Sequence, residues 1–73
     1  MLQRFTAIIE REGDLFVALC PELDVASQGG SVAEARANLA EALSLYFETA
    51  SAEEISRRLT SEVYVTQVEV AVG

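Results

Sequence analysis

Few side chains in this sequence are of the types that catalyse reactions. Cys20 is the single cysteine, and the chain contains no histidine. Histidine is the commonest general base and the usual partner of a catalytic serine or cysteine, so its absence removes those arrangements. Cys20 closes the apolar run Leu15–Cys20, where a thiol is normally a small, inert hydrophobe. We therefore predict that no residue of this chain is catalytic.

Carboxylates are the remaining candidates for chemistry. Glu22 and Asp24 lie close in sequence and, with Glu10 or Glu12, could bind a divalent cation. A vestigial nuclease of the ribonuclease-H type would use Glu10, Glu22 or Asp24 with Mg²⁺ in this way. Such a site needs several oxygen ligands that converge on one point, and the spacing does not fix that geometry. We favour solvated turn carboxylates, with no metal and no cofactor, and keep the nuclease as an alternative.

Two adjacent glycines precede a predicted helix and raise the question of phosphate binding. Gly29 and Gly30 lead into Ser31 and Val32, and a helix N-terminus can hold an anion. The sequence has no Gly-x-Gly-x-x-Gly motif and no lysine to meet a phosphate. We interpret these glycines as turn residues that let the chain enter the helix.

The charge balance is strongly acidic. Twelve acidic residues oppose five basic ones, all of them arginine, for a formal charge of −7. Such a surface repels phosphate backbones, so we expect no direct nucleic-acid binding. Complementary charge would favour a basic protein partner, although solubility alone also accounts for an acidic surface.

Apolar alternation predicts three strands in the first part of the chain. The first covers residues 2–11 and ends at a turn in which Gly13 can take a positive φ. The unbroken apolar run Leu15–Cys20 is typical of a central strand that is buried on both faces, and Pro21 ends it. A short third strand follows at residues 25–28.

Two capping patterns predict helices in the second part. Ser31 with Glu34 matches a capping box, and apolar residues then recur at helical spacing to residues 48–50. Ser51 with Glu54 predicts a second, short helix over residues 52–59. Alternation over residues 62–72 predicts a final edge strand. The predicted class is α+β, a three-stranded antiparallel meander packed by one main helix, then a short helix and an edge strand, in the order β-β-β-α-β.

This layout predicts that the chain associates with a second copy of itself or with another protein. Residues 1–73 are enough for one domain, and so small a core is marginal without a disulfide, a metal or another subunit. The single cysteine and the lack of histidine leave oligomerisation as the common route. One main helix covers one sheet face, yet the strands offer apolar side chains to both faces. A homo-oligomer that binds a small ligand at its interface is a further alternative.

Two stretches of the sequence resemble the HicB antitoxin family. The first is Phe16 to Gly29, with a Pro-Glu-Leu turn at residues 21–23. The second is Ser31 to Leu43, with Glu-Ala at 34–35, Asn38, and Glu-Ala-Leu at 41–43 in the spacing of the HicB helix. The resemblance covers residues 1 to about 50 well and the last strand by pattern only.

The resemblance implies a fold similar to a degraded ribonuclease-H-like half and self-association through the sheet. It implies an antitoxin that neutralises a small basic ribonuclease toxin of the HicA type by covering its active surface. Many HicB antitoxins carry a C-terminal DNA-binding domain, and we expect none within these 73 residues. We further expect a cytoplasmic protein with no membrane segment. The predicted partner surface is the loop Pro21, Glu22, Leu23 and Asp24 with the adjacent sheet face.

Overall fold

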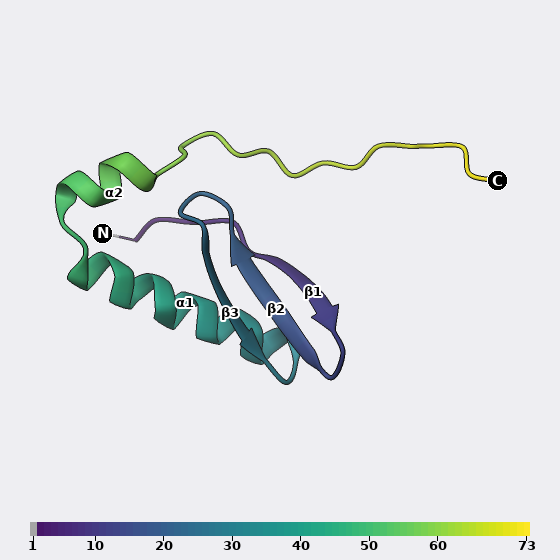
Figure 1. Ribbon diagram of the computed structural model, residues 1–73, viewed down its shortest axis with the longest axis horizontal. Coiled ribbons are helices and arrows are strands. Elements are labelled where there is room, and N and C mark those ends of the chain that lie inside the picture. The colour runs from purple at the N-terminus through teal and green to yellow at the C-terminus, as the bar shows by residue number, and fades with distance from the viewer. Residues whose placement is uncertain (1) are drawn as a thin grey trace.

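Three short strands and two helices follow one another along the chain (Figure 1). The computed structural model describes residues 2–73. The strands are β1 (Ile8–Glu12), β2 (Leu15–Cys20) and β3 (Val25–Gly29), and the helices are α1 (Val32–Thr49) and α2 (Ala52–Arg58). The predicted α+β class with a three-stranded antiparallel sheet is confirmed.

The strands form one antiparallel sheet in the order β1-β2-β3. Glu12 pairs with Leu15 across a two-residue turn, in which Gly13 has a φ of 65°. Glycine at the first position of such a turn is typical of type II′, whose twist suits a hairpin. The sheet therefore has β2 in its centre, as the sequence predicted.

The first strand is shorter than predicted, because it begins at Ile8 rather than at residue 2. Ile8 pairs with Leu19, so pairing further toward the N-terminus would soon reach Pro21, which has no N–H to donate. Thr6 instead donates its backbone N–H to the side chain of Glu22. Residues 2–7 therefore leave the ladder and run past the end of the sheet.

Helix α1 covers one face of the sheet and lies mainly against β3 and β2. The Ser31 hydroxyl accepts a hydrogen bond from the Glu34 N–H (3.1 Å), as the predicted capping box requires. The Glu34 carboxylate accepts from the N–H of Gly30 (2.7 Å), one residue before the cap. The reciprocal bond is therefore present but shifted by one residue. The Glu34 carboxylate lies in the first turn of α1, where a negative charge interacts favourably with the helix dipole.

Helix α2 repeats part of this pattern in a shorter form. The Ser51 hydroxyl accepts from the Glu54 N–H (3.1 Å), and the helix ends at Arg58, one residue before the predicted end. Arg57 and Arg58 occupy the last turn, where positive charge is favourable. The helix contributes no buried residue to the core.

The core lies between α1 and the sheet. Its fully buried side chains come from β2, the loop after it and α1, and they are Ala18, Cys20, Leu23, Ala35 and Leu39. Six half-buried residues pack around them: Phe5, Ile9, Phe16, Val25, Leu43 and Tyr46. The backbones of β3 and α1 approach closely at Gly29, where an added Cβ would lie 2.6 Å from the Ala35 nitrogen. Such a small core gives modest stability.

The predicted final edge strand is not part of the sheet. Residues 59–73, here named the C-terminal arm, contain no helix or strand and extend away from the sheet (green to yellow in Figure 1). Alternation shows only that a segment suits a pleated, half-buried surface, and the arm leaves α2 in a direction that does not meet a sheet edge of its own chain. Within residues 2–73, no helix is long and apolar enough to cross a membrane.

Candidate functional site

The loop between β2 and β3, residues 21–24, is the predicted partner loop, and Glu22 is its most connected side chain. Both carboxylate oxygens of Glu22 accept from the Thr6 N–H, at 3.0 and 3.1 Å. One of them also accepts from the Thr6 hydroxyl at 2.7 Å, and the other accepts from the Cys20 thiol at 3.4 Å. Glu22 therefore ties the segment before β1 to the end of β2.

The backbone of the same loop holds the end of α2. The Arg58 guanidinium donates through Nη2 to the carbonyl oxygens of Leu23 (2.8 Å) and Asp24 (3.1 Å). The Thr60 N–H donates to the carbonyl of Glu22 (2.8 Å). The Arg58 guanidinium also lies 5.2 Å from the centre of the Tyr46 ring, a cation–π distance. These contacts fix the point at which the C-terminal arm begins.

The four residues of the predicted partner loop thus differ in what they offer to a partner. Leu23 is fully buried in the core and has no surface to offer. Glu22 and Pro21 are half-buried, and Glu22 is already hydrogen-bonded. Asp24 is exposed and has a φ of 55°, a conformation that aspartate tolerates better than most residues. Asp24 is therefore the member of the loop whose charge a partner can reach, and partner binding there stays a prediction.

Cys20 and Glu22 influence each other's ionisation. Burial raises the pKa of the Cys20 thiol, and the neighbouring Glu22 carboxylate raises it further. Burial also acts to raise the pKa of Glu22, but the hydrogen bonds from Thr6 and Cys20 outweigh it, so the pKa of Glu22 lies below its ordinary value. A buried thiol with a raised pKa is a poor nucleophile at neutral pH.

The carboxylates considered for a metal site do not converge. Glu10 is on β1, Glu22 is bound to Thr6, and Asp24 lies beyond the buried Leu23. Within the described residues, no group of three or more histidine, cysteine, aspartate or glutamate side chains could hold a metal ion together. The vestigial-nuclease alternative therefore has no ligand set in this part of the chain.

The sheet has a second face that neither helix covers, here named the open face. Phe16, Ala18 and Cys20 of β2 face α1, so the alternate residues of β2 and their cross-strand neighbours face the opposite way. The open face comprises Ile8, Glu10 and Glu12 of β1, Leu15, Val17 and Leu19 of β2, and Ala26 and Gln28 of β3. The prediction that β2 is buried on both faces is therefore wrong for this side.

The open face combines apolar and acidic side chains in a definite arrangement. Ile8 and Leu15 are each 41% exposed, and Val17 and Leu19 are half-buried between the neighbouring strands. Glu10 lies beside Val17, and Glu12 lies beside Leu15. Arg11 is the one arginine of the three described strands, and it points to the other side, where its guanidinium lies 5.0 Å from the centre of the Phe16 ring. The charged side chains of the open face are thus the carboxylates of Glu10 and Glu12, which lie on the β1 side of an apolar strip formed by Ile8, Leu15, Val17 and Leu19.

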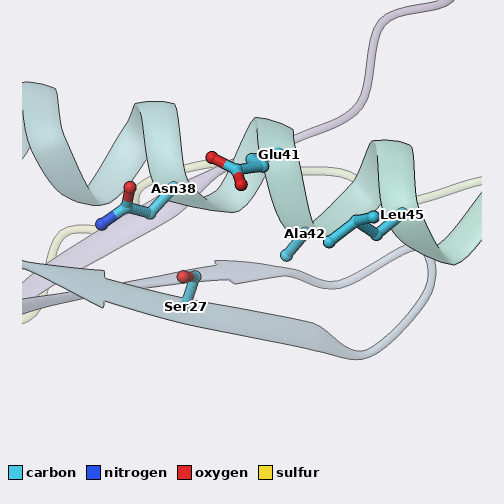
Figure 2. A pocket seen from close by; sticks show the side chains of 5 residues that line it. All are labelled: Ser27, Asn38, Glu41, Ala42 and Leu45. Carbon is cyan, nitrogen blue, oxygen red and sulfur yellow. The ribbon is translucent and has the colours of Figure 1, made fainter.

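A shallow hollow lies between α1 and the outer edge of β3. Figure 2 shows Ser27 of β3 facing the side chains of Asn38, Glu41, Ala42 and Leu45 on α1. Its volume is about 240 Å³, which is small for a ligand site. A second hollow of about 370 Å³ lies where the N-terminal segment meets the start of the C-terminal arm. Both hollows are open to solvent, and most of the side chains that line them are polar. The small-ligand alternative concerns an interface between subunits, so it stays a prediction.

Sequence reasoning anticipated part of this arrangement. Apolar residues offered to both sheet faces, with one main helix to cover them, indicated an uncovered face, and the register now assigns its residues. The role of Glu22 was missed, because its partner Thr6 lies 16 positions away in sequence. Comparison with known proteins adds no relative: no protein-family model, no curated protein and no solved structure matches this chain significantly.

Proposed function

We propose that this chain is a non-enzymatic, protein-binding module of the HicB antitoxin type. In this proposal it neutralises a small basic ribonuclease of the HicA type by masking the active surface of that toxin. The observation that carries the proposal is the open face of the sheet, an apolar strip with carboxylates beside it and no base on it. The resemblance of residues 16–43 to HicB antitoxins supplies the class of partner.

The chemistry of the open face favours a basic protein over other partners. Ile8, Leu15, Val17 and Leu19 would lose water on contact, at about 25 cal/mol for each Å² of apolar surface buried. Glu10 and Glu12 would meet arginine or lysine at the edge of that contact, where opposite charge speeds encounter and disfavours wrong partners. The formal charge of −7 repels nucleic acid and attracts a cationic enzyme surface.

The partner loop contributes to the proposal through Asp24. This exposed carboxylate would add to the negative field that guides a basic partner, whereas Leu23 and Glu22 would keep the loop in shape. A reducing cytosol is the proposed location, because the single thiol, Cys20, stays unpaired there.

The test is binding to a purified HicA-type ribonuclease, measured by calorimetry and by loss of RNA cleavage. We expect a complex at micromolar concentrations and inhibited cleavage. Charge reversal by Glu10→Arg with Glu12→Arg should weaken binding at least about tenfold, because two attractive contacts become repulsive. Asp24→Asn, which keeps a residue tolerant of positive φ, should slow association by a smaller factor.

A matched control changes the same number of charges away from the open face. Glu41→Arg with Glu48→Arg alters two exposed glutamates of α1 and should reduce affinity much less. No complex at micromolar concentrations would rule out this class of partner. Equal losses for the β1 and α1 pairs would show that net charge alone, and not the open face, attracts the toxin.

A further inference from the structure

The C-terminal arm is an apolar segment that pairs with no strand among residues 2–73. Its large side chains are among the most exposed in the structure: Tyr64 80%, Val65 66%, Val68 82%, Val70 72% and Val72 89%. The backbone of the arm makes a hydrogen bond to the body at Thr60, and no backbone hydrogen bond within residues 2–73 involves residues 61–73. The arm is therefore an extended strand in sequence and shape, with its peptide groups free.

The outer edge of β1 has no neighbouring strand within residues 2–73, so it could pair with an extended segment such as the arm. The edge of β3 is partly closed by α1, because the Asn38 amide donates to the Gln28 carbonyl at 2.8 Å. β1 has β2 on one side and no strand or helix along its other side within residues 2–73. An uncovered edge strand presents a row of peptide groups to any extended chain that reaches it.

We propose that the C-terminal arm pairs with the outer edge of β1 in a second copy of this chain, and that two copies exchange arms reciprocally. A single two-fold axis then fills both vacant edges and buries both arms in one closed dimer. The same chain carries the unpaired strand and the unpaired edge, so no third component is needed. This dimer is distinct from the proposed contact with a toxin, which uses the open face.

Two features favour a second copy over closure within one chain. Arg58 and Thr60 anchor the start of the arm to the loop at residues 21–24, and from there the arm runs away from its own sheet (Figure 1). The core contains only five fully buried hydrophobic residues among those described, so a single copy has little other means of covering its apolar arm.

The alternation of the arm gives a sharp way to test the pairing. One side of an extended strand carries Tyr64, Thr66, Val68, Val70 and Val72, and the other side carries Val63, Val65, Gln67 and Glu69. The second side is therefore polar at residues 67–69. Val68→Glu places a charge on the apolar side, and Gln67→Glu places the same charge on its neighbour as a matched control. Both positions are exposed and outside the core, so both variants should keep the helical content of the parent.

The experiment measures mass by light scattering during gel filtration, over a dilution series of the full chain. We expect a species of twice the 7.9 kDa chain mass at about 100 µM and below. Val68→Glu should raise the dimer dissociation constant at least about tenfold, and Gln67→Glu less than about threefold. Amide hydrogen exchange by NMR should show that amides of β1 and of residues 64–70 become protected together as the dimer forms.

Several results would overturn the proposal. One is a monomer throughout the dilution series, whether its arm amides are exposed or are protected by folding onto their own sheet. Another is a dimer whose dissociation constant Val68→Glu leaves unchanged. A third is a dimer in which the arm amides are protected but those of β1 are not, since the arms would then pair with each other. Toxin binding is scored separately, with the Glu10 and Glu12 variants, so either proposal can fail alone.

Discussion

The contacts of its ring, and not a hydrogen bond of its hydroxyl, determine the position of the Tyr46 side chain. The ring packs against the core, lies beneath the Arg58 guanidinium and meets Phe47 edge-on, with ring centres 5.6 Å apart. Its oxygen is buried and has no hydrogen-bond partner among the described residues. A buried polar group without a partner costs free energy, so this hydroxyl weakens the position that the ring stabilises.

Removing that hydroxyl should therefore leave the free energy of unfolding unchanged or raise it. We expect Tyr46→Phe to raise the free energy of unfolding by up to about 1 kcal/mol, because it deletes an unpaired polar atom and keeps the ring. Tyr46→Leu, which also deletes the aromatic face under Arg58, should lower it. Urea denaturation at one fixed protein concentration measures both. A clear loss of stability in Tyr46→Phe would mean that the hydroxyl has a partner in solution.

At the scale of single residues, prediction from sequence succeeded where the interaction is local. Ser31 and Ser51 cap their helices through the residue three positions on, a distance that a motif can encode. The sequence predicts partner binding for Glu22, which stays a prediction, but it did not indicate that the Glu22 carboxylate accepts from Thr6 or that its carbonyl accepts from Thr60. Thr6 and Thr60 come close to Glu22 only in the folded chain, so no sequence motif predicts these contacts.

At the scale of elements, the packing of β3 against α1 depends on a glycine. The Cβ of any other residue at position 29 would meet the backbone of the first turn of α1, at 2.6 Å from Ala35 N and 2.8 Å from Glu34 C. Sequence reasoning gave Gly29 and Gly30 the same turn role, yet the two positions differ. At Gly30 the nearest atom to such a Cβ is a carboxylate oxygen of Glu34 at 3.6 Å, an ordinary contact.

This difference predicts opposite outcomes for adjacent substitutions. Gly29→Ala should lower the free energy of unfolding by about 1–3 kcal/mol, because α1 must move away from the strand. Gly30→Ala should be neutral or add up to about 1 kcal/mol, because alanine restricts the unfolded chain and fits the folded one. Thermal unfolding followed by circular dichroism separates the two. Equal effects at both positions would contradict the close approach at Gly29.

The order and type of the elements were largely predictable, and the failures have a common cause. Strand β2, helix α1 and helix α2 were located to within a residue or two, because period and caps are local signals. Strand β1 began later than expected, and the final strand did not join the sheet. In both cases alternation described a segment that suits a strand, while its surroundings decided whether a strand forms: Pro21 lies opposite the expected N-terminal part of β1, and the arm leaves α2 in a direction that meets no edge of its own sheet.

At the scale of the whole molecule, the loop at residues 21–24 connects the N-terminal segment, the sheet and α2. Glu22 links residues before β1 to the loop after β2, and the same loop anchors the end of α2 through Arg58. The open face, by contrast, was foreseen in outline, because an apolar central strand and a single covering helix leave one side bare. Its exact residues required the register, which composition does not determine.

The Glu22 carboxylate should make stability depend on acid pH. Its pKa in the folded chain lies below the ordinary value of 4.5, so its contribution is present in full above that value and is lost as the pH falls through the lowered pKa. Denaturation across pH 3–7 should therefore show a declining free energy of unfolding at the acid end. Glu22→Gln should flatten that decline and be less stable at neutral pH. Glu48→Gln, on the exposed side of α1, should behave as the parent, and an unchanged slope in Glu22→Gln would refute this role.

If two copies exchange arms as proposed, the free edge of β1 and the free arm also limit how many copies can assemble. A chain with one strand to give and one edge to receive is a bifunctional monomer in the sense of polymer chemistry, able to close into a ring or to extend without limit. The anchored start of the arm restricts the angle between neighbours, and the negative charge on every chain disfavours long chains of copies. The smallest closed ring, a pair, is then the form that ends growth, and a longer or looser connection between α2 and the arm would favour filaments.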